Sequence, residues 1–96
     1  MLHTVIQVKP TQDFKVYVYF SDGKIKLYDI APFIGNGVFK QISAIDDFIE
    51  KCTVINNTLA WDIGGNFDEY KCLDIDPETI YSDGIEVSDP LSGQAA

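Results

Sequence analysis

The sequence predicts a single α+β domain, in which a small antiparallel sheet packs with two or three short helices. Three observations lead to this fold class. Side chains alternate strictly from Phe14 to Phe20, with Val16 and Val18 on one face and Tyr17 on the other, which is the period of a half-buried strand. Residues 38–51 carry apolar side chains spaced by three and four, as a helix requires. A chain of 96 residues with 46% hydrophobic residues can bury one core but not two.

The first sheet is expected to be a three-stranded meander. Residues 5–8 form a short β-rich run that ends before Pro10, and residues 14–20 form the second strand. Asp22-Gly23 is typical of a two-residue type I′ hairpin turn, which makes residues 24–29 the third strand. That turn sets Phe20 opposite Ile25, Val18 opposite Leu27 and Tyr17 opposite Tyr28. The expected register therefore places Tyr17, Tyr19 and Tyr28 together on the outer face, as the candidate interaction residues.

Helices are expected in the middle of the chain and near its end. Pro32 and the glycines of 35–37 break the strand pattern, and residues 38–51 then form either one helix or two short ones. For two helices, Ser43 is the expected N-cap of the second, with Asp46 and Asp47 in its first turn at the positive end of the helix dipole.

A second hairpin follows the helical region. Residues 53–55 and 59–63 are its expected strands, and Asn56-Asn57 is its turn, since Asn tolerates the left-handed conformation. Trp61 is the expected anchor of the core. Residues 70–73 form a further short strand or extended segment, and Asp76-Pro77 begins a helix that runs to residue 81. We expect one domain over residues 1–87 and a flexible C-terminal tail over 88–96.

Charge is distributed unevenly along the chain. Residues 1–45 hold five Lys and three acids, whereas residues 46–96 hold two Lys and twelve acids, and the net charge is −8. Such a surface repels phosphate, so direct nucleic-acid binding is not expected. The acidic half instead suits either a solvated surface or a basic partner protein. No apolar run is long enough for a membrane span, no signal peptide is recognised, and we expect a cytoplasmic protein without membrane contact.

Catalytic, cofactor and metal motifs are not recognised. His3 is the one histidine and is expected at an exposed strand end, without a nucleophile beside it. Cys52 and Cys72 lack metal-site spacing and are expected to be reduced, small core residues. Asp74, Asp76 and Glu78 superficially resemble a site for a hard cation, but the loop pattern of an EF-hand fails and a capped helix start explains them. We therefore assign no catalytic, cofactor-binding or metal residue.

The tyrosine patch leaves three interpretations open. Tyr side chains bury large area at little entropic cost, so the patch can bind a partner or a small ligand. It can also be covered by the C-terminal segment, or it can join two copies of the chain in a homodimer. In the homodimer, Lys15 and Lys26 are expected to reach acids of the partner's C-terminal half.

Several blocks of the sequence together resemble a known bacterial family. They are the turn Phe20-Ser21-Asp22-Gly23, the stretch Tyr28-Asp29-Ile30-Ala31-Pro32 with Phe39 after it, the run Leu59-Ala60-Trp61, and the block 74–81 reading Asp-Ile-Asp-Pro-Glu-Thr-Ile-Tyr. Over residues 4–82 the chain resembles the domain of unknown function 2442 family. The resemblance implies a compact α+β domain, and it implies a neighbouring gene for a second small protein, as in a toxin–antitoxin pair. It implies no activity. Some members append a DNA-binding helical domain, which we do not expect here, and so we expect no transcriptional role.

These observations predict an uncharacterised small bacterial protein that acts as a non-enzymatic protein-interaction module. Its expected partners are a second copy of itself and the product of the neighbouring gene. The alternative is a divalent-metal-dependent hydrolase or a small-ligand-binding protein that uses Asp74, Asp76 and Glu78.

Overall fold

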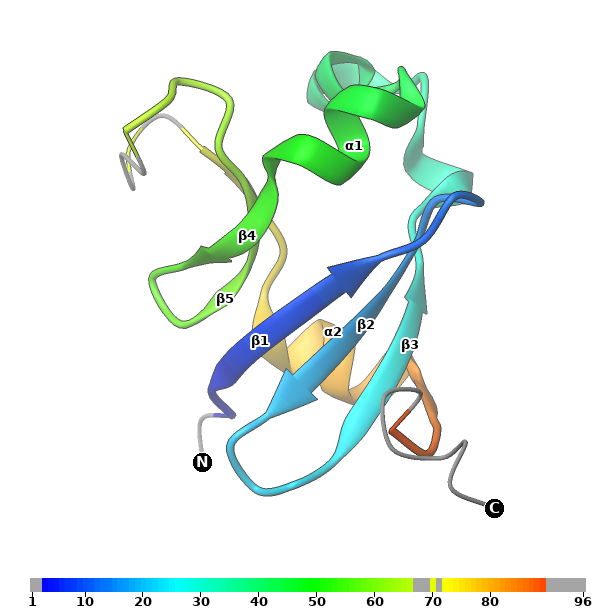
Figure 1. The fold of residues 1–96 in the computed structure, drawn as a ribbon, viewed down its shortest axis with the longest axis vertical. Coiled ribbons are helices and arrows are strands. Elements are labelled where there is room, and N and C mark those ends of the chain that lie inside the picture. Colours follow the sequence, from blue (N-terminus) through cyan, green and yellow to red (C-terminus); the bar gives the residue numbers. More distant parts are fainter. Residues whose placement is uncertain (1–2, 67–69, 71, 90–96) are drawn as a thin grey trace.

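The first sheet has four antiparallel strands in the order β1-β2-β3-β7. The computed structural model describes residues 3–66, 70 and 72–89. The strands of this sheet are β1 (Val5–Pro10), β2 (Lys15–Phe20), β3 (Ile25–Asp29) and β7 (Ile85–Glu86), as Figure 1 shows. The expected three-stranded meander is confirmed. The sequence did not predict β7, which returns from the end of the chain to pair with β3.

The expected register of the first hairpin is wrong by one residue. Tyr17 lies opposite Leu27, and Tyr28 lies opposite Val16. The cause is a three-residue loop, in which the N–H of Phe20 donates to the carbonyl of Lys24 at 2.9 Å. Only the third loop residue, Gly23, has a positive φ, of 92°. Because strand side chains alternate, the shift moves every side chain of β3 to the opposite face from the one expected.

The helices are short, and residues 38–51 form two of them. These are the 3-10 helix η2 (Gly37–Ile42) and the helix α1 (Ile45–Lys51), which follow the 3-10 helix η1 (Ala31–Phe33). The expected cap at Ser43 is wrong, because Ala44 holds the N-cap position and the Ser43 hydroxyl donates to the carbonyl of Lys40 at 2.8 Å. Asp46 and Asp47 do lie in the first turn of α1.

Helix α2 (Pro77–Asp83) begins as its sequence predicts. The Asp76 carboxylate accepts a hydrogen bond from the N–H of Glu78 at 3.0 Å, and Pro77 is the first helical residue. This cap satisfies one of the free N–H groups at the helix start, and proline loses no hydrogen bond there.

The second sheet contains the predicted second hairpin. It has the antiparallel order β4-β5-β6, with β4 (Cys52–Ile55), β5 (Thr58–Trp61) and the short β6 (Leu73–Asp74). Asn56 and Asn57 form the turn with φ angles of 54° and 65°, so both adopt the left-handed conformation of a two-residue turn. The strand β5 is shorter than the expected 59–63 run and ends at Trp61.

The core lies where the two sheets and the helices meet. Trp61 is fully buried, and its indole N–H donates to the carbonyl of Phe48 at 3.1 Å, which confirms its expected role as an anchor. Phe14 precedes β2 instead of belonging to it. Its φ of 64° accompanies packing of its ring at 5.0 Å from that of Phe48. The buried cluster contains Val5, Val16, Val18, Phe20, Tyr28, Ile30, Ile42, Phe48, Leu59, Trp61 and Ile80.

Helix α2 covers one face of the first sheet and leaves the other face without a helix among the described residues. Figure 1 shows α2 behind β1, β2 and β3. Its Ile80 is buried in the same cluster as Val16 and Val18 of β2.

Within the described part of the chain, no helix is long and apolar enough to cross a membrane. From residue 90 onward, the expected tail of residues 88–96 lies outside the described residues.

Candidate functional site

The outer face of the first sheet is the face turned away from α2. Pairing places two rows of side chains on it, because directly paired residues of neighbouring strands point to the same side. One row runs across all four strands and the other across three. The outer face is therefore defined by Lys9, Tyr17, Leu27 and Ile85 in the first row and by Gln7, Tyr19 and Ile25 in the second. Ile85 is 68% exposed and Tyr17 is half-buried, so the first row presents apolar surface to solvent.

Tyr28 does not belong to the expected tyrosine patch. It lies on the core side of β3 and is 6% exposed. Its ring stacks on that of Phe33 with centroids 6.4 Å apart, and burial raises the pKa of its hydroxyl above the ordinary value. The register error explains the correction, since a shift of one residue exchanges Tyr28 for Leu27 on the outer face.

The C-terminal segment covers part of the outer face. The Tyr19 hydroxyl donates to the Asp89 carboxylate at 3.0 Å, and the N–H of Val87 donates to the carbonyl of Ile25 at 2.9 Å. Tyr19 is 9% exposed, and burial followed by the hydrogen bond to Asp89 raises its pKa to about 12. The second row is thus partly covered from within the chain, while Ile85 in the first row stays mostly exposed.

The three carboxylates at residues 74–78 have separate surroundings. Asp74 lies exposed in β6 opposite Ala60, and Asp76 caps α2. The Glu78 carboxylate accepts a hydrogen bond from the backbone N–H of His3, and its second oxygen lies 2.8 Å from His3 Nδ1. These two hydrogen bonds lower the pKa of Glu78. No three His, Cys, Asp or Glu side chains of the described residues converge as metal ligands do.

The sequence predicted that His3 lies exposed at the end of a strand, and this prediction is wrong. Its ring stacks on the ring of Tyr81 with centroids 3.6 Å apart. The Tyr81 hydroxyl donates to the Asp22 carboxylate at 2.7 Å, which lowers the pKa of Asp22 and raises that of Tyr81. We call His3, Asp22, Glu78 and Tyr81 the N-terminal clasp, because they tie the start of the chain and the first hairpin loop to α2. The one available signal was the spacing of Glu78 and Tyr81, which places both on one side of a helix.

The two cysteines lie in different surroundings. Cys52 packs against the core, and burial raises the pKa of its thiol to about 12, so the thiol is neutral at pH 7. Cys72 is half-buried at the wall of a cavity. No disulfide links Cys52 and Cys72.

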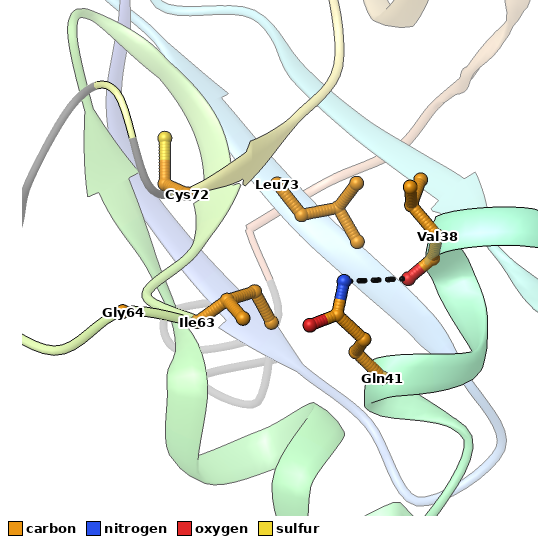
Figure 2. A pocket seen from close by; sticks show the side chains of 6 residues that line it. All are labelled: Val38, Gln41, Ile63, Gly64, Cys72 and Leu73. Atoms are coloured by element: carbon orange, nitrogen blue, oxygen red, sulfur yellow. Dashed lines mark hydrogen bonds between the residues drawn. The ribbon is translucent and has the colours of Figure 1, made fainter.

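A mostly apolar cavity of about 390 Å³ opens at one end of the second sheet. Figure 2 shows side chains from η2, from the segment after β5 and from β6 gathered around it. Among the described lining residues, Gln41 supplies the one side-chain amide, and its Nε2 donates to the carbonyl of Val38 at 3.3 Å. The lining residues are Val38, Gln41, Ile63, Gly64, Cys72 and Leu73. They come from three separate segments, so no sequence pattern pointed to the cavity.

Comparisons with known proteins identify a family without an assigned activity. Neither the search of curated proteins nor that of solved structures found a significant match. A family model described as "Protein of unknown function (DUF2442)" matches residues 5–86. That span begins with β1 and ends with β7, so it includes both sheets and α2. The chain therefore belongs to the DUF2442 family, whose function is unknown.

Proposed function

We propose that this protein is a non-enzymatic protein-interaction module that forms a homodimer through the outer face. The observation that carries the proposal is the row Tyr17, Leu27 and Ile85, which presents aromatic and aliphatic side chains on a face that α2 does not cover. Aromatic and aliphatic side chains in contiguous rows are typical of interface cores. A second copy can bury the row against itself, as a two-fold interface does.

Charge at the two ends of the row supports a second copy as the occupant. Lys9 lies exposed at the β1 end, and no ion pair joins it to a described residue. Asp89 lies at the β7 end, shortly after the edge strand, where its carboxylate accepts the hydroxyl of Tyr19 on the outer face. A two-fold axis parallel to the strands places the basic end of each copy over the acidic end of the other. An axis along the row instead opposes like ends, so charge favours the first arrangement.

The acidic C-terminal half supports a second kind of partner. Residues 46–96 hold twelve acids and two Lys, so their field attracts a basic protein surface over a distance of about 10 Å at moderate ionic strength. We propose that the module binds such a basic partner on a surface other than the outer face. The product of the neighbouring gene, implied by the family resemblance, is the first protein to test.

Sedimentation equilibrium tests the homodimer. The wild-type protein at about 100 µM, well above a micromolar dissociation constant, is expected at twice the chain mass of 10.7 kDa. Tyr17→Glu is expected to give the single-chain mass with an unchanged circular dichroism spectrum, because it buries two charges in the interface. Val38→Lys, in η2 at the cavity wall, is the matched control and should leave the dimer intact. A wild-type protein at the single-chain mass, or a dimer that survives Tyr17→Glu, overturns the proposal.

A further inference from the structure

The cavity at the end of the second sheet has the size of a small-molecule site. Its volume of about 390 Å³ lies within the range of ligand pockets, and an apolar cavity of about 150 Å³ is enough to bind benzene. Figure 2 shows Val38, Ile63 and Leu73 gathered around this space, and each contributes aliphatic surface. The cavity therefore has room for one ring that carries a short substituent.

Water is poorly held in this cavity. A bound water needs about two to four polar partners. Among the described lining residues, only Gln41 and Cys72 carry a polar side-chain atom, and a thiol is a weak hydrogen-bond partner. A molecule with an apolar surface releases such water on binding, and this release favours the bound state.

One polar group of the wall has a fixed direction. Gln41 Nε2 donates to the carbonyl of Val38 at 3.3 Å, which leaves the amide oxygen of Gln41 to accept a hydrogen bond. Figure 2 shows this oxygen on the side of the amide that faces Ile63. A ligand hydroxyl or N–H can donate to it while the rest of the ligand packs on the aliphatic wall.

A cation finds no counter-ion among the described lining residues. None of the six is charged, and the two carboxylates next to them in the sequence lie elsewhere. Asp74 follows Leu73 in β6, so its side chain points to the opposite face of the strand. Asp62 lines a separate, smaller cavity beside Cys52. A cation therefore loses hydration in the cavity without gaining a charged partner.

An anion is disfavoured as well. The chain has a net charge of −8, and the second sheet lies in the half that holds twelve of its fifteen acids. Lys40 adjoins Gln41 in the 3-10 helix η2, but Val38 and Gln41 are three residues apart and share one side of it. Lys40 lies about a third of a turn away from that side. The cavity therefore suits a neutral molecule.

We propose that this cavity binds a small, neutral molecule that has one apolar ring and one hydrogen-bond donor beside the ring. The ring packs on Val38, Ile63 and Leu73, and the donor meets the amide oxygen of Gln41. This site goes beyond the proposed role as a protein-interaction module, lies on other elements than the outer face, and does not depend on the homodimer.

Four probes that share one ring test the class of ligand by nuclear magnetic resonance titration of the full chain. They are benzyl alcohol, benzyl methyl ether, benzoate and benzylamine. Benzyl alcohol is expected to shift the Gln41 side-chain amide and the Leu73 backbone amide saturably, with a dissociation constant of about 1 mM. The ether cannot donate and should bind about fivefold more weakly, as the loss of one hydrogen bond implies. The two charged probes should give no saturable shift at about ten times that concentration.

Two variants complete the test. Gln41→Leu removes the acceptor but keeps a side chain of similar size at this exposed position, so it should bind the alcohol and the ether equally. Tyr17→Glu should bind the alcohol as the wild-type protein does, whether or not it is monomeric. The cavity proposal is overturned by an absence of saturable shifts with benzyl alcohol, by equal binding of the charged probes, or by a preference for the alcohol that survives Gln41→Leu. None of these results bears on the homodimer, which sedimentation decides.

Discussion

The two hairpins differ in one loop residue, and that difference decides which side chains reach the surface. In the β4–β5 hairpin, Asn56 and Asn57 both have positive φ, and the loop has two residues. In the β2–β3 hairpin, only Gly23 has positive φ, so Asp22 takes an ordinary conformation and the loop has three residues. A two-residue type I′ loop needs two left-handed residues. Asn56-Asn57 supplies both, whereas only the glycine of the Asp-Gly pair in the first hairpin is left-handed.

An Asp-Gly pair does not by itself specify the length of a hairpin loop. The Asp22 carboxylate accepts a hydrogen bond from the N–H of Lys24 at 2.9 Å, two residues on, as Asp side chains do at the start of turns. With Asp22 in that role, Gly23 becomes the single left-handed residue that ends a three-residue loop. The same two residue types thus permit two loop lengths, and the buried side chains of β3 select between them.

The largest expected effect contrasts Tyr28 with Tyr17. Tyr28→Ala should lower the free energy of unfolding by about 3 kcal/mol, because it leaves a cavity in the core, whereas Tyr17→Ala should lower it by less than about 1 kcal/mol. Urea denaturation of both variants measures the difference. Comparable losses of unfolding free energy, or a larger loss for Tyr17, would favour the two-residue loop and the register expected from the sequence.

Glycine at the end of the first loop gives the next effect. Gly23→Ala should destabilise the fold by about 1 kcal/mol, because a φ of 92° is unfavourable for a residue with a Cβ, even though the added atom meets nothing within 4 Å. Asn57→Gly in the second loop is the matched control. Its change in unfolding free energy should stay within about 0.5 kcal/mol, since Gly accepts the same φ. Two equally damaging substitutions would mean that Gly23 matters through a contact and not through its backbone.

The N-terminal clasp makes the stability of the folded protein depend on pH. The pKa of Glu78 is lowered in the folded state, so its contribution is present above the ordinary value of 4.5 and is lost as pH falls through the lower folded-state value. Glu78→Gln should therefore lower the melting temperature at about pH 6, and its gap from wild type should close toward about pH 3. A gap that persists at low pH would show that the carboxylate charge is not what holds His3.

The smallest expected effect concerns the hydrogen bond between α2 and the first hairpin loop. Tyr81→Phe removes the hydroxyl that donates to Asp22, but leaves the ring that stacks on His3. We expect a slight loss of melting temperature and an Asp22 pKa that returns toward its ordinary value, because this hydrogen bond is the main cause of its lowering. Carboxylate titration by nuclear magnetic resonance measures the second change. An Asp22 pKa that stays as low as in wild type would assign the shift to the neighbouring backbone instead.

Local patterns predicted most of the fold. The alternation in β2, the Asn56-Asn57 turn and the cap at Asp76 depend on neighbours a few residues away, and the structure has all three. The missed features depend on partners far along the chain. Strand β7 pairs with β3 across about sixty residues, and the clasp joins His3 to α2, so no local pattern shows either.

The candidate sites show the same difference between features set by neighbouring residues and features set by residues far apart in the chain. Tyr17 and Tyr19 share a face because period-2 alternation fixes them relative to each other within one strand. Tyr28 was assigned by counting across a loop, and one wrong loop length misplaced it. The cavity draws its wall from η2 before the second sheet, from the segment between β5 and β6, and from β6 itself, and only tertiary structure places these together.

A single backbone contact between the two sheets has a consequence for the order of folding. The N–H of Val5 in β1 donates to the carbonyl of Asn57 in the second turn at 3.0 Å. This bond closes a loop of some fifty residues, and that closure costs more chain entropy than closing the short loop of either hairpin. Each hairpin can therefore form early, but the Val5 amide becomes protected from exchange only after the two halves have docked. Its hydrogen exchange reports when the two halves of the chain become one cooperative unit.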